Sequence, residues 1–474
     1  MELRDLAGIV VGHLLSVAGV ICGVILFSRL RAGHHPPSAT FAWLLAIIFV
    51  PYVGVPLFLV FGGRKLRRLV RAKGPLSLKA NRSVDNIEGV GEAAQIPLLV
   101  GKPPPFSGGN AVDLLPDAVD NYRRLMEMID GAKETIHITT FILTRDEVAK
   151  AIVDALARKA TEGVKVRLLL DGLGSFNALG SFLAPLRDAG GQVGTFLPVL
   201  RLRWKWSAHL RNHRKVVIVD GREAMVGGRN IGAEYIAPAP HPGLWRDFAI
   251  VVRGPVVASL QEIFASDWEF ATEEDAEGIM AESLPTAPER SGNVTIQTVA
   301  SGPDIEADAF HETVLGAMFQ ARRRVWIVTP YFIPDAMILR TLTTLAQIGR
   351  DVRVVVPAKS DKVMVDLARR YYLRELCRAG ATVYLHRGPQ LHTKLLLIDG
   401  ELAAVGSPNM DMRSLYLNYE LALFVYSSEE TRGIEAHVGE LIEQADIYDP
   451  RERRAPGMVT RALENFGYLV SPLL

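Results

Sequence analysis

The chain has 474 residues, which is longer than one ordinary domain and predicts two or three. Its apolar fraction of 49% is enough to fill packed cores, and its formal net charge of +1 argues against a general nucleic-acid-binding protein. The charge is unevenly placed: residues 1–74 hold nine Lys and Arg against two Asp and Glu, which gives +7 there and −6 for the other 400 residues. Positive charge and apolar residues therefore coincide at the N-terminus, as in a membrane anchor.

Two apolar runs lie near the N-terminus, GIVVGHLLSVAGVICGVILFS at 8–28 and FAWLLAIIFVPYVGVPLFLVF at 41–61. Each has about the 20 residues that cross a bilayer as a helix, so residues 1–74 are predicted to form a transmembrane hairpin. A signal peptide is the alternative for the first run, but Glu2 and Asp5 precede it and a second apolar run follows soon. The basic residues of 64–73 predict that this end, and the part of the chain beyond it, lie in the cytoplasm and close to an anionic membrane surface.

After an irregular linker at 75–110, the chain repeats itself. IHITTFILTRDEVAKAIVDALARKATEGVKVRLLLDG (136–172) and VWIVTPYFIPDAMILRTLTTLAQIGRDVRVVVPAKS (325–360) each contain an apolar strand, a helix of period near 3.6 and a second apolar strand. This order is typical of a βαβ unit with parallel strands, and the lack of alternation predicts strands buried on both faces. We therefore predict two duplicated α/β sandwich halves, 111–285 and 286–474, packed with pseudo-two-fold symmetry.

A second repeated pattern lies downstream of each βαβ unit. HRKVVIVDGREAMVGGRN (213–230) and HTKLLLIDGELAAVGSPN (392–409) share the pattern H-x-K-x4-D-x6-G-x-x-N. A lone His-x-Lys is usually a solvent-exposed strand end, but two complete copies at equivalent places exclude coincidence. In each copy the histidine and the lysine are two residues apart at the start of an apolar strand, so their side chains point to one face.

The residues of this pattern suit phosphoryl transfer without a metal or another cofactor. One imidazole can attack phosphorus while the other protonates the leaving alkoxide and later deprotonates the acceptor. The lysines and asparagines can neutralise and bind the phosphate oxygens, and a small residue can line the turn beside them. The candidates are His213, Lys215 and Asn230 in the first copy, and His392, Lys394, Ser407 and Asn409 in the second. No cluster with metal-ligand spacing lies beside them.

Two aspartates complete the pattern and count among the catalytic candidates. Asp220 and Asp399 each end an apolar strand directly before a glycine. This position favours a role in the turn or in a salt bridge over a role in catalysis.

The paired motifs resemble those of the phospholipase D superfamily, in which each half supplies one set of residues to a shared site. Four further stretches resemble its bacterial cardiolipin synthase branch: WLLAIIFVPYVGVPLFLVFGGRK (43–65), SGPD (301–304), TPYFIPD (329–335) and SPNMDMRSLYLNYE (407–420). The resemblance implies transfer of a phosphatidyl group from one phosphatidylglycerol to another, with release of glycerol, at the bacterial cytoplasmic (inner) membrane. Hydrolysis instead of transfer, and other donor or acceptor lipids, stay open, and the sequence does not indicate the oligomeric state.

The resemblance also implies roles for individual residues. His213 would be the nucleophile, and His392 the general acid and then the general base. An acid downstream of each motif would hydrogen-bond a catalytic histidine, and the matching residues are Asp247 and Glu420; a strand-edge charge is the alternative for both. The first copy has Gly228 where the general pattern has serine, which predicts the loss of one hydrogen bond and no loss of activity.

A segment upstream of His213, RLRWKWSAHLRNHRK (201–215), interleaves basic and aromatic residues. The pattern favours contact with a membrane interface, with nucleic acid or a solvated loop as alternatives. The residues are Arg201, Arg203, Lys205, Arg211 and Arg214 with Trp204 and Trp206.

Overall fold

The computed structural model describes residues 106–198, 210–283, 290–305 and 308–450, together with 11–14, 17–19, 21, 45, 47, 49–50, 73–76, 78–79, 464 and 467. The chain separates into two compact units, Met1–Ala72 and Lys73–Leu474. The predicted transmembrane hairpin, 8–28 and 41–61, falls largely outside the described residues. Within the described part, no helix combines the length and the apolar character needed to cross a bilayer.

The first half begins with a strand that starts inside the predicted linker 75–110. Its elements, in chain order, are β1 (Phe106–Leu115), α6 (Ala118–Gly131), β2 (Thr135–Thr140), α7 (Glu147–Thr161), β3 (Lys165–Asp171), η2 (Ser181–Leu183), α8 (Ala184–Asp188), β4 (Gln192–Phe196), β5 (Val216–Val219), β6 (Glu223–Gly227), β7 (Ala249–Arg253), α9 (Val256–Thr272) and α10 (Ala276–Ser283). The helix of the predicted βαβ unit, α7, starts where the side chain of Asp146 accepts a hydrogen bond from the backbone N–H of Ala149. Its apolar stripe, which includes Ile152 and Leu156, is buried.

The second half repeats this order. Its elements are β8 (Val294–Ser301), α11 (Ala309–Gln320), β9 (Arg324–Val328), β10 (Phe332–Ile333), α12 (Ala336–Gln347), β11 (Asp351–Pro357), α13 (Val363–Arg378), β12 (Thr382–His386), β13 (Leu395–Ile398), β14 (Leu402–Gly406), β15 (Met410–Asp411), α14 (Met412–Tyr416), β16 (Glu420–Tyr426), α15 (Ser428–Glu443) and β17 (Ala445–Ile447). The duplication predicted from the two βαβ repeats is therefore present. The predicted boundary between the halves, 285/286, falls outside the described residues.

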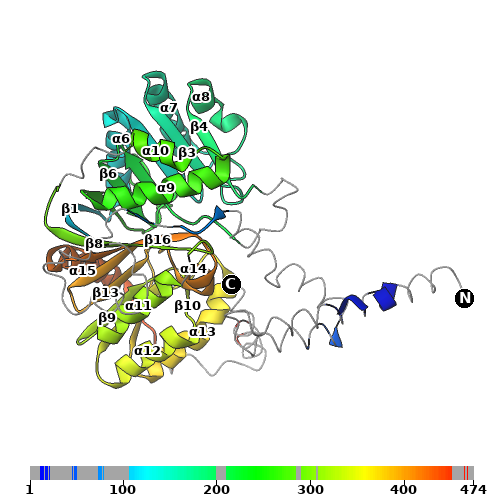
Figure 1. The fold of residues 1–474 in the computed structure, drawn as a ribbon. Coiled ribbons are helices and arrows are strands. Elements are labelled where there is room, and N and C mark those ends of the chain that lie inside the picture. Colours follow the sequence, from blue (N-terminus) through cyan, green and yellow to red (C-terminus); the bar gives the residue numbers. More distant parts are fainter. Residues whose placement is uncertain are drawn as a thin grey trace, which may run out of the picture. The chain divides into compact units, whose positions relative to one another are not determined.

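Strands of both halves form one continuous mixed sheet. Its order is β17-β12-β11-β9-β13-β14-β16-β8-β1-β7-β6-β5-β2-β3-β4, and the antiparallel pair β1–β8 joins the halves. Apart from the edge strand β17, equivalent strands follow the same order outward from this pair, as pseudo-two-fold symmetry requires. Figure 1 shows the first half, in cyan and green, and the second half, in yellow to brown, on opposite sides of β1, β8 and β16.

The parallel strands predicted for the βαβ units are present. Strands β2, β3 and β4 pair in parallel, and so do β9, β11 and β12. The motif strands run the other way: β5 is antiparallel to β2 and β6, and β13 is antiparallel to β9 and β14. The reason is that short turns join β5 to β6 and β13 to β14, and such turns connect only antiparallel neighbours.

Each half has its own apolar core around its central strands. All six residues of β2 are buried, and β3 and β9 are buried beyond their first residue, which confirms the prediction that strands of the βαβ units are covered on both faces. All four residues of β5 and of β13 are buried as well. Helix α7 packs on β3, and α9 packs on β4, β5, β6 and β7. These cores hold the residues at the strand ends rigidly.

Candidate active site

The two His-x-Lys motifs lie directly before β5 and β13. Because β5 is antiparallel to β2, and β13 to β9, the motif residues come to the carboxyl ends of β2 and β9. In the register, Thr139 near the end of β2 faces Val216, and Val328 at the end of β9 faces Leu395. The carboxyl ends of parallel strands are the usual place for ligands in open α/β sheets.

Backbone hydrogen bonds tie each motif to the opposite half. The N–H of His213 donates to the carbonyl of Tyr419 over 2.9 Å, and the N–H of His392 donates to the carbonyl of Arg246 over 2.7 Å. Tyr419 directly precedes Glu420, as Arg246 directly precedes Asp247. Each histidine is therefore held in register with the acid of the other half.

The side chains pair in the same crossed manner. Glu420 Oε2 lies 2.9 Å from His213 Nδ1, and Asp247 Oδ2 lies 2.6 Å from His392 Nδ1. The predicted hydrogen bond between an acid and each motif histidine is thus present, and each acid comes from the half that does not contain its histidine. Because Nδ1 is engaged, Nε2 is the ring nitrogen that remains for a substrate.

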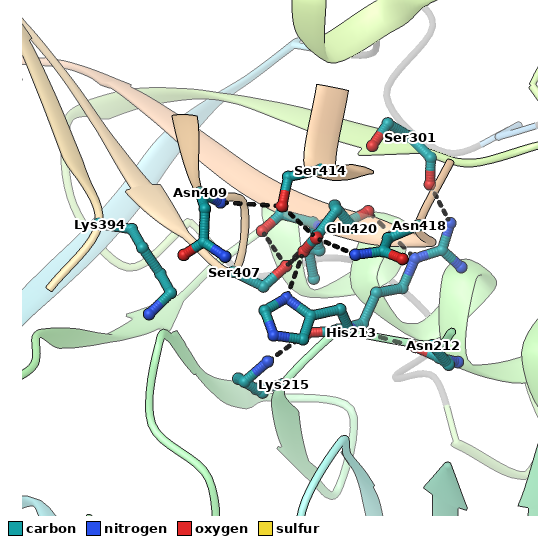
Figure 2. Close-up of polar contacts among 12 residues, drawn as sticks. Asn212, His213, Lys215, Ser301, Lys394, Ser407, Asn409, Ser414, Asn418 and Glu420 are labelled. Carbon is teal, nitrogen blue, oxygen red and sulfur yellow. Dashed lines mark hydrogen bonds and ion pairs between the residues drawn. The ribbon is translucent and has the colours of Figure 1, made fainter. Parts of the chain in front are cut away.

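The carboxylate of Glu420 is fully buried and held by several donors (Figure 2). Ser407 Oγ donates to its Oε2 over 2.5 Å, and Ser414 Oγ and Asn418 Nδ2 donate to its Oε1 over 2.8 and 3.3 Å. Sequence reasoning singled out Ser407 but missed Ser414 and Asn418, although both lie in the stretch 407–420. Both lie within six residues of Glu420 in sequence, but neither belongs to the repeated motif.

The carboxylate of Asp247 is held differently. Its Oδ1 accepts a hydrogen bond of 2.8 Å from the backbone N–H of Phe248, and Lys394 Nζ lies 3.9 Å from its Oδ2. A Cβ atom added at Gly228 would lie 2.3 Å from Asp247 Oδ1. A serine at this position would require the Asp247 carboxylate to shift, and the expectation that glycine at 228 costs no activity stays a prediction.

Both motif lysines are buried beside their histidines. Lys215 Nζ donates to the carbonyl of His213 over 2.6 Å. Lys394 Nζ donates to the carbonyl of His392 and lies 2.9 Å from its Nδ1. Burial lowers the pKa of Lys215 to about 7 and that of Lys394 to about 8, although nearby carboxylates oppose the shift.

Burial also sets the charge of the histidine–acid pairs. It lowers the pKa of His213 and of His392, with the neighbouring carboxylates opposing the shift. Burial alone would raise the pKa of Asp247 and Glu420, but lysine and histidine neighbours outweigh it and hold both below their usual values. A neutral imidazole beside an ionised carboxylate is the state from which a ring nitrogen can attack, whereas an imidazole that serves as the acid must be protonated on both nitrogens.

Comparisons with known proteins agree with this geometry. The family described as "Cardiolipin synthase, PLD-like domain" matches residues 125–268 and 314–442, and "Phospholipase_D-nuclease N-terminal" matches 18–63. The chain is 34% identical to cardiolipin synthase 1 of Bacillus anthracis over 98% of its own length and 94% of the relative's. It is 33% identical to the major cardiolipin synthase ClsA of Bacillus subtilis over 97% of its own length and 98% of the relative's.

The chain belongs to the cardiolipin synthase family of phospholipase D-like enzymes. Among solved structures, phosphatidylserine synthase of Haemophilus influenzae is similar in fold, with a TM-score of 0.61 at 16% identity over 81% of this chain and 100% of that one.

The two motif asparagines of this cardiolipin synthase family member differ in their contacts. Asn230 Oδ1 accepts a hydrogen bond of 3.2 Å from the backbone N–H of Ile142. Asn409 Oδ1 is buried and has no hydrogen-bond partner among the described residues. Binding of phosphate by either asparagine stays a prediction.

The motif aspartates lie at the other end of the motif strands, away from the histidines. Asp220 accepts hydrogen bonds of 2.7–2.9 Å from the backbone N–H groups of Lys133, Glu134 and Thr135. Asp399 accepts hydrogen bonds of 2.7–2.8 Å from the backbone N–H groups of residues 322–324. Both have positive φ, 51° and 55°. These contacts fit the role in the turn that their position before a glycine suggested, and a catalytic role for either aspartate stays a prediction.

Aromatic rings that sequence reasoning missed line the histidines. Phe141 lies edge-on to His213, with ring centres 5.0 Å apart. Trp245 and Tyr235 lie 5.3 and 5.8 Å from His392. These rings lower the local dielectric constant around the two histidines. They thereby strengthen the charge interactions within the two histidine–acid pairs.

The prediction that residues 201–215 contact the membrane interface is wrong for the C-terminal end of this segment. Arg211 and Arg214 are buried and pair with Asp171 and Asp267, so they cannot lie against a lipid surface. Residues 201–209 fall outside the described part. In the described part of the chain, no group of three or more His, Cys, Asp or Glu side chains is placed to hold a metal ion, and a reaction without metal stays a prediction.

Proposed function

We propose that this protein transfers a phosphatidyl group from one phosphatidylglycerol to the headgroup hydroxyl of another, giving cardiolipin and glycerol. The crossed His213–Glu420 and His392–Asp247 pairs are the observation that supports this most strongly, because they supply two oriented imidazoles to one site. Two relatives that match nearly the whole chain are named cardiolipin synthases.

In the first half-reaction, Nε2 of His213 attacks the phosphorus atom of the donor lipid. The bond from phosphorus to the headgroup glycerol oxygen breaks. His392 enters this step protonated on both ring nitrogens, with Asp247 stabilising its charge, and gives that oxygen a proton. A phosphatidyl group is then bound to His213, and Glu420 stabilises the positive charge of its ring. Lys215 and Lys394 neutralise the non-bridging oxygens as charge accumulates on them.

In the second half-reaction, His392 acts as a base. It takes the proton from a headgroup hydroxyl of the second phosphatidylglycerol, whose oxygen attacks the phosphorus atom. The P–N bond to His213 breaks and the histidine is restored, while Asp247 stabilises the protonated His392. Water in place of the lipid hydroxyl would give phosphatidic acid, so the acceptor alone separates a transferase from a phospholipase D-type hydrolase.

We further propose that residues 1–74 anchor the protein by a two-helix hairpin in the bacterial cytoplasmic (inner) membrane, with the catalytic part facing the cytoplasm. The apolar runs 8–28 and 41–61, the basic residues after them, and the family match at 18–63 support this. Protease added outside intact spheroplasts should leave the catalytic part uncut, and its digestion would reverse the orientation.

The reaction is tested with the purified full-length protein in vesicles that contain labelled phosphatidylglycerol. Equal amounts of cardiolipin and glycerol are expected, whereas phosphatidic acid alone would identify a hydrolase. His392→Ala, given a phosphatidyl ester with a good leaving group, should accumulate an adduct on His213 that mass spectrometry detects. His213→Ala should accumulate none, and an adduct on His392 in that variant would exchange the two roles. His241→Ala, at an exposed histidine, is the matched control and should behave like the wild type.

A further inference from the structure

A buried cluster of four charged side chains lies behind the His213–Glu420 pair. Lys73 Nζ lies 2.7 Å from Asp267 Oδ1 and also contacts Asp304 Oδ2. Arg214 Nη1 donates to both carboxylate oxygens of Asp267 over 2.7 Å. All four side chains are at most 1% exposed. Two positive charges thus balance two negative charges in a site that water does not reach.

Arg214 connects this cluster to both members of the catalytic pair. It stands between His213 and Lys215 in the sequence, and its Nε donates to the backbone carbonyl of Glu420 over 3.1 Å. Its Nη2 donates to the backbone carbonyl of Ser301 over 3.0 Å. A shift of Arg214 would therefore displace the chain on either side of the His213–Glu420 hydrogen bond.

Lys73 contacts the same place from another direction. Its Nζ lies 5.1 Å from the centre of the Tyr419 ring, and the Arg214 guanidinium lies 5.5 Å from it. The carbonyl of Tyr419 accepts the backbone N–H of His213, and Tyr419 directly precedes Glu420. Two cations over one ring thus hold the residue that sets the register of the pair.

The cluster explains two residues of the stretch SGPD (301–304), its aspartate and its glycine. Its aspartate, Asp304, binds Lys73, and the backbone of Asp304 also accepts the N–H of Leu76 over 2.9 Å. Gly302 has φ of 146°, and a Cβ atom there would lie 2.7 Å from a ring atom of Tyr419. Only glycine therefore lets this turn approach Tyr419.

The second motif is built differently at the matching position. Thr393 stands where the first motif has Arg214, and its hydroxyl donates to the carbonyl of Arg246 over 3.1 Å. A local hydrogen bond thus holds the His392 side, whereas the His213 side depends on a lysine 140 residues earlier in the chain.

We propose that Lys73 is a positioning residue for the His213–Glu420 pair. Without its charge, one arginine would face two buried carboxylates, and Asp304 would draw Arg214 away from the carbonyl of Glu420. Catalysis then requires the contacts that Lys73 and Leu76 make with Asp267 and Asp304. This role builds on the phosphatidyl transfer proposed above.

The test uses the full-length protein in phosphatidylglycerol vesicles. Lys73→Met should lower kcat at least tenfold with KM changed less than twofold, and Lys73→Arg should keep most of the rate. The double variant Lys73→Met/Asp304→Asn restores the charge balance and should return kcat to within threefold of the wild type. Lys79→Met is the matched control, because Lys79 is exposed and binds Glu262 through its backbone N–H.

A second readout isolates the step that Lys73 supports. In a His392→Ala background, the rate of adduct formation on His213 should fall at least tenfold on adding Lys73→Met and stay unchanged on adding Lys79→Met. A Lys73→Met rate within twofold of the wild type would overturn the proposal, as would a loss that Asp304→Asn does not restore. If the wild type forms the adduct but no cardiolipin, the proposed function fails, while the adduct rates still decide the role of Lys73.

Discussion

Replacing Gly228 by serine would restore the residue of the general motif, yet the structure predicts that it lowers activity. A Cβ atom at 228 would lie 2.3 and 2.7 Å from the two carboxylate oxygens of Asp247. The optimum separation of non-bonded atoms is about 3.5–4.0 Å, so the carboxylate must move by roughly 1 Å. Asp247 is fully buried between His392 and the backbone N–H of Phe248 and cannot swing into solvent.

The expected size of the effect follows from the contacts that the movement breaks. The 2.6 Å bond between Asp247 and His392 joins a carboxylate to a catalytic imidazole. A hydrogen bond to a charged group contributes about 1.5–3 kcal/mol, which corresponds to a loss of roughly 10- to 150-fold in kcat. Overpacking should also lower the free energy of unfolding by about 1–3 kcal/mol.

The assay compares cardiolipin formation by Gly228→Ser, Gly228→Ala and the wild type in phosphatidylglycerol vesicles. Serine and alanine should lower kcat to a similar extent, because the shared Cβ atom causes the clash. Ser407→Gly in the other half is the comparison without a clash: it removes one of several donors to the ionised Glu420 and by the same rule should cost about 1.5–3 kcal/mol, or roughly 10- to 150-fold in rate. A wild-type rate in Gly228→Ser would refute the reasoning.

The remaining predictions concern pH, metal and the strand turns. The transfer rate should fall above about pH 7 to 8, as Lys215 and Lys394 lose the protons that neutralise phosphate; a rate still rising at pH 9 would contradict the role of the lysines. EDTA should leave the transfer rate largely intact, and a requirement for one divalent ion would disprove the metal-free mechanism. Modest stimulation by a divalent ion would not, since such ions also screen the charge of anionic lipids. Asp220→Ala should lower the free energy of unfolding in urea by about 1–3 kcal/mol through three unpaired amides, with kcat within threefold of the wild type.

The duplicated fold and the residues of the site could be predicted from the sequence because both are local patterns. Each βαβ unit is a continuous stretch of sequence, and each motif is complete within 18 residues. The mixed sheet was also within reach, since Asp-Gly at 220–221 and at 399–400 is a hairpin signal between two apolar strands. The prediction of parallel strands concerned only the βαβ units, and no order was predicted for the motif strands.

The crossed pairing could not be predicted, because it depends on contacts between distant segments. Glu420 is 207 residues from His213, and Asp247 is 145 residues from His392. The same limit explains the error at Arg211 and Arg214. Their partners, Asp171 and Asp267, lie in other elements, and an arginine without a visible partner in sequence is expected on the surface.

The crossed pairs also explain why the two acids differ. Glu420 is one methylene longer than Asp247, and its carboxylate lies where Ser407 can donate to it, whereas the carboxylate of Asp247 occupies the place that a side chain at 228 would need. Each acid therefore fits only one small residue, serine with glutamate and glycine with aspartate. If so, Gly228→Ser/Asp247→Glu should recover most of the activity that Gly228→Ser alone loses, and Asp247→Glu alone should stay impaired because it lacks the serine that holds the longer acid. A double variant no more active than Gly228→Ser would show that the two positions act independently.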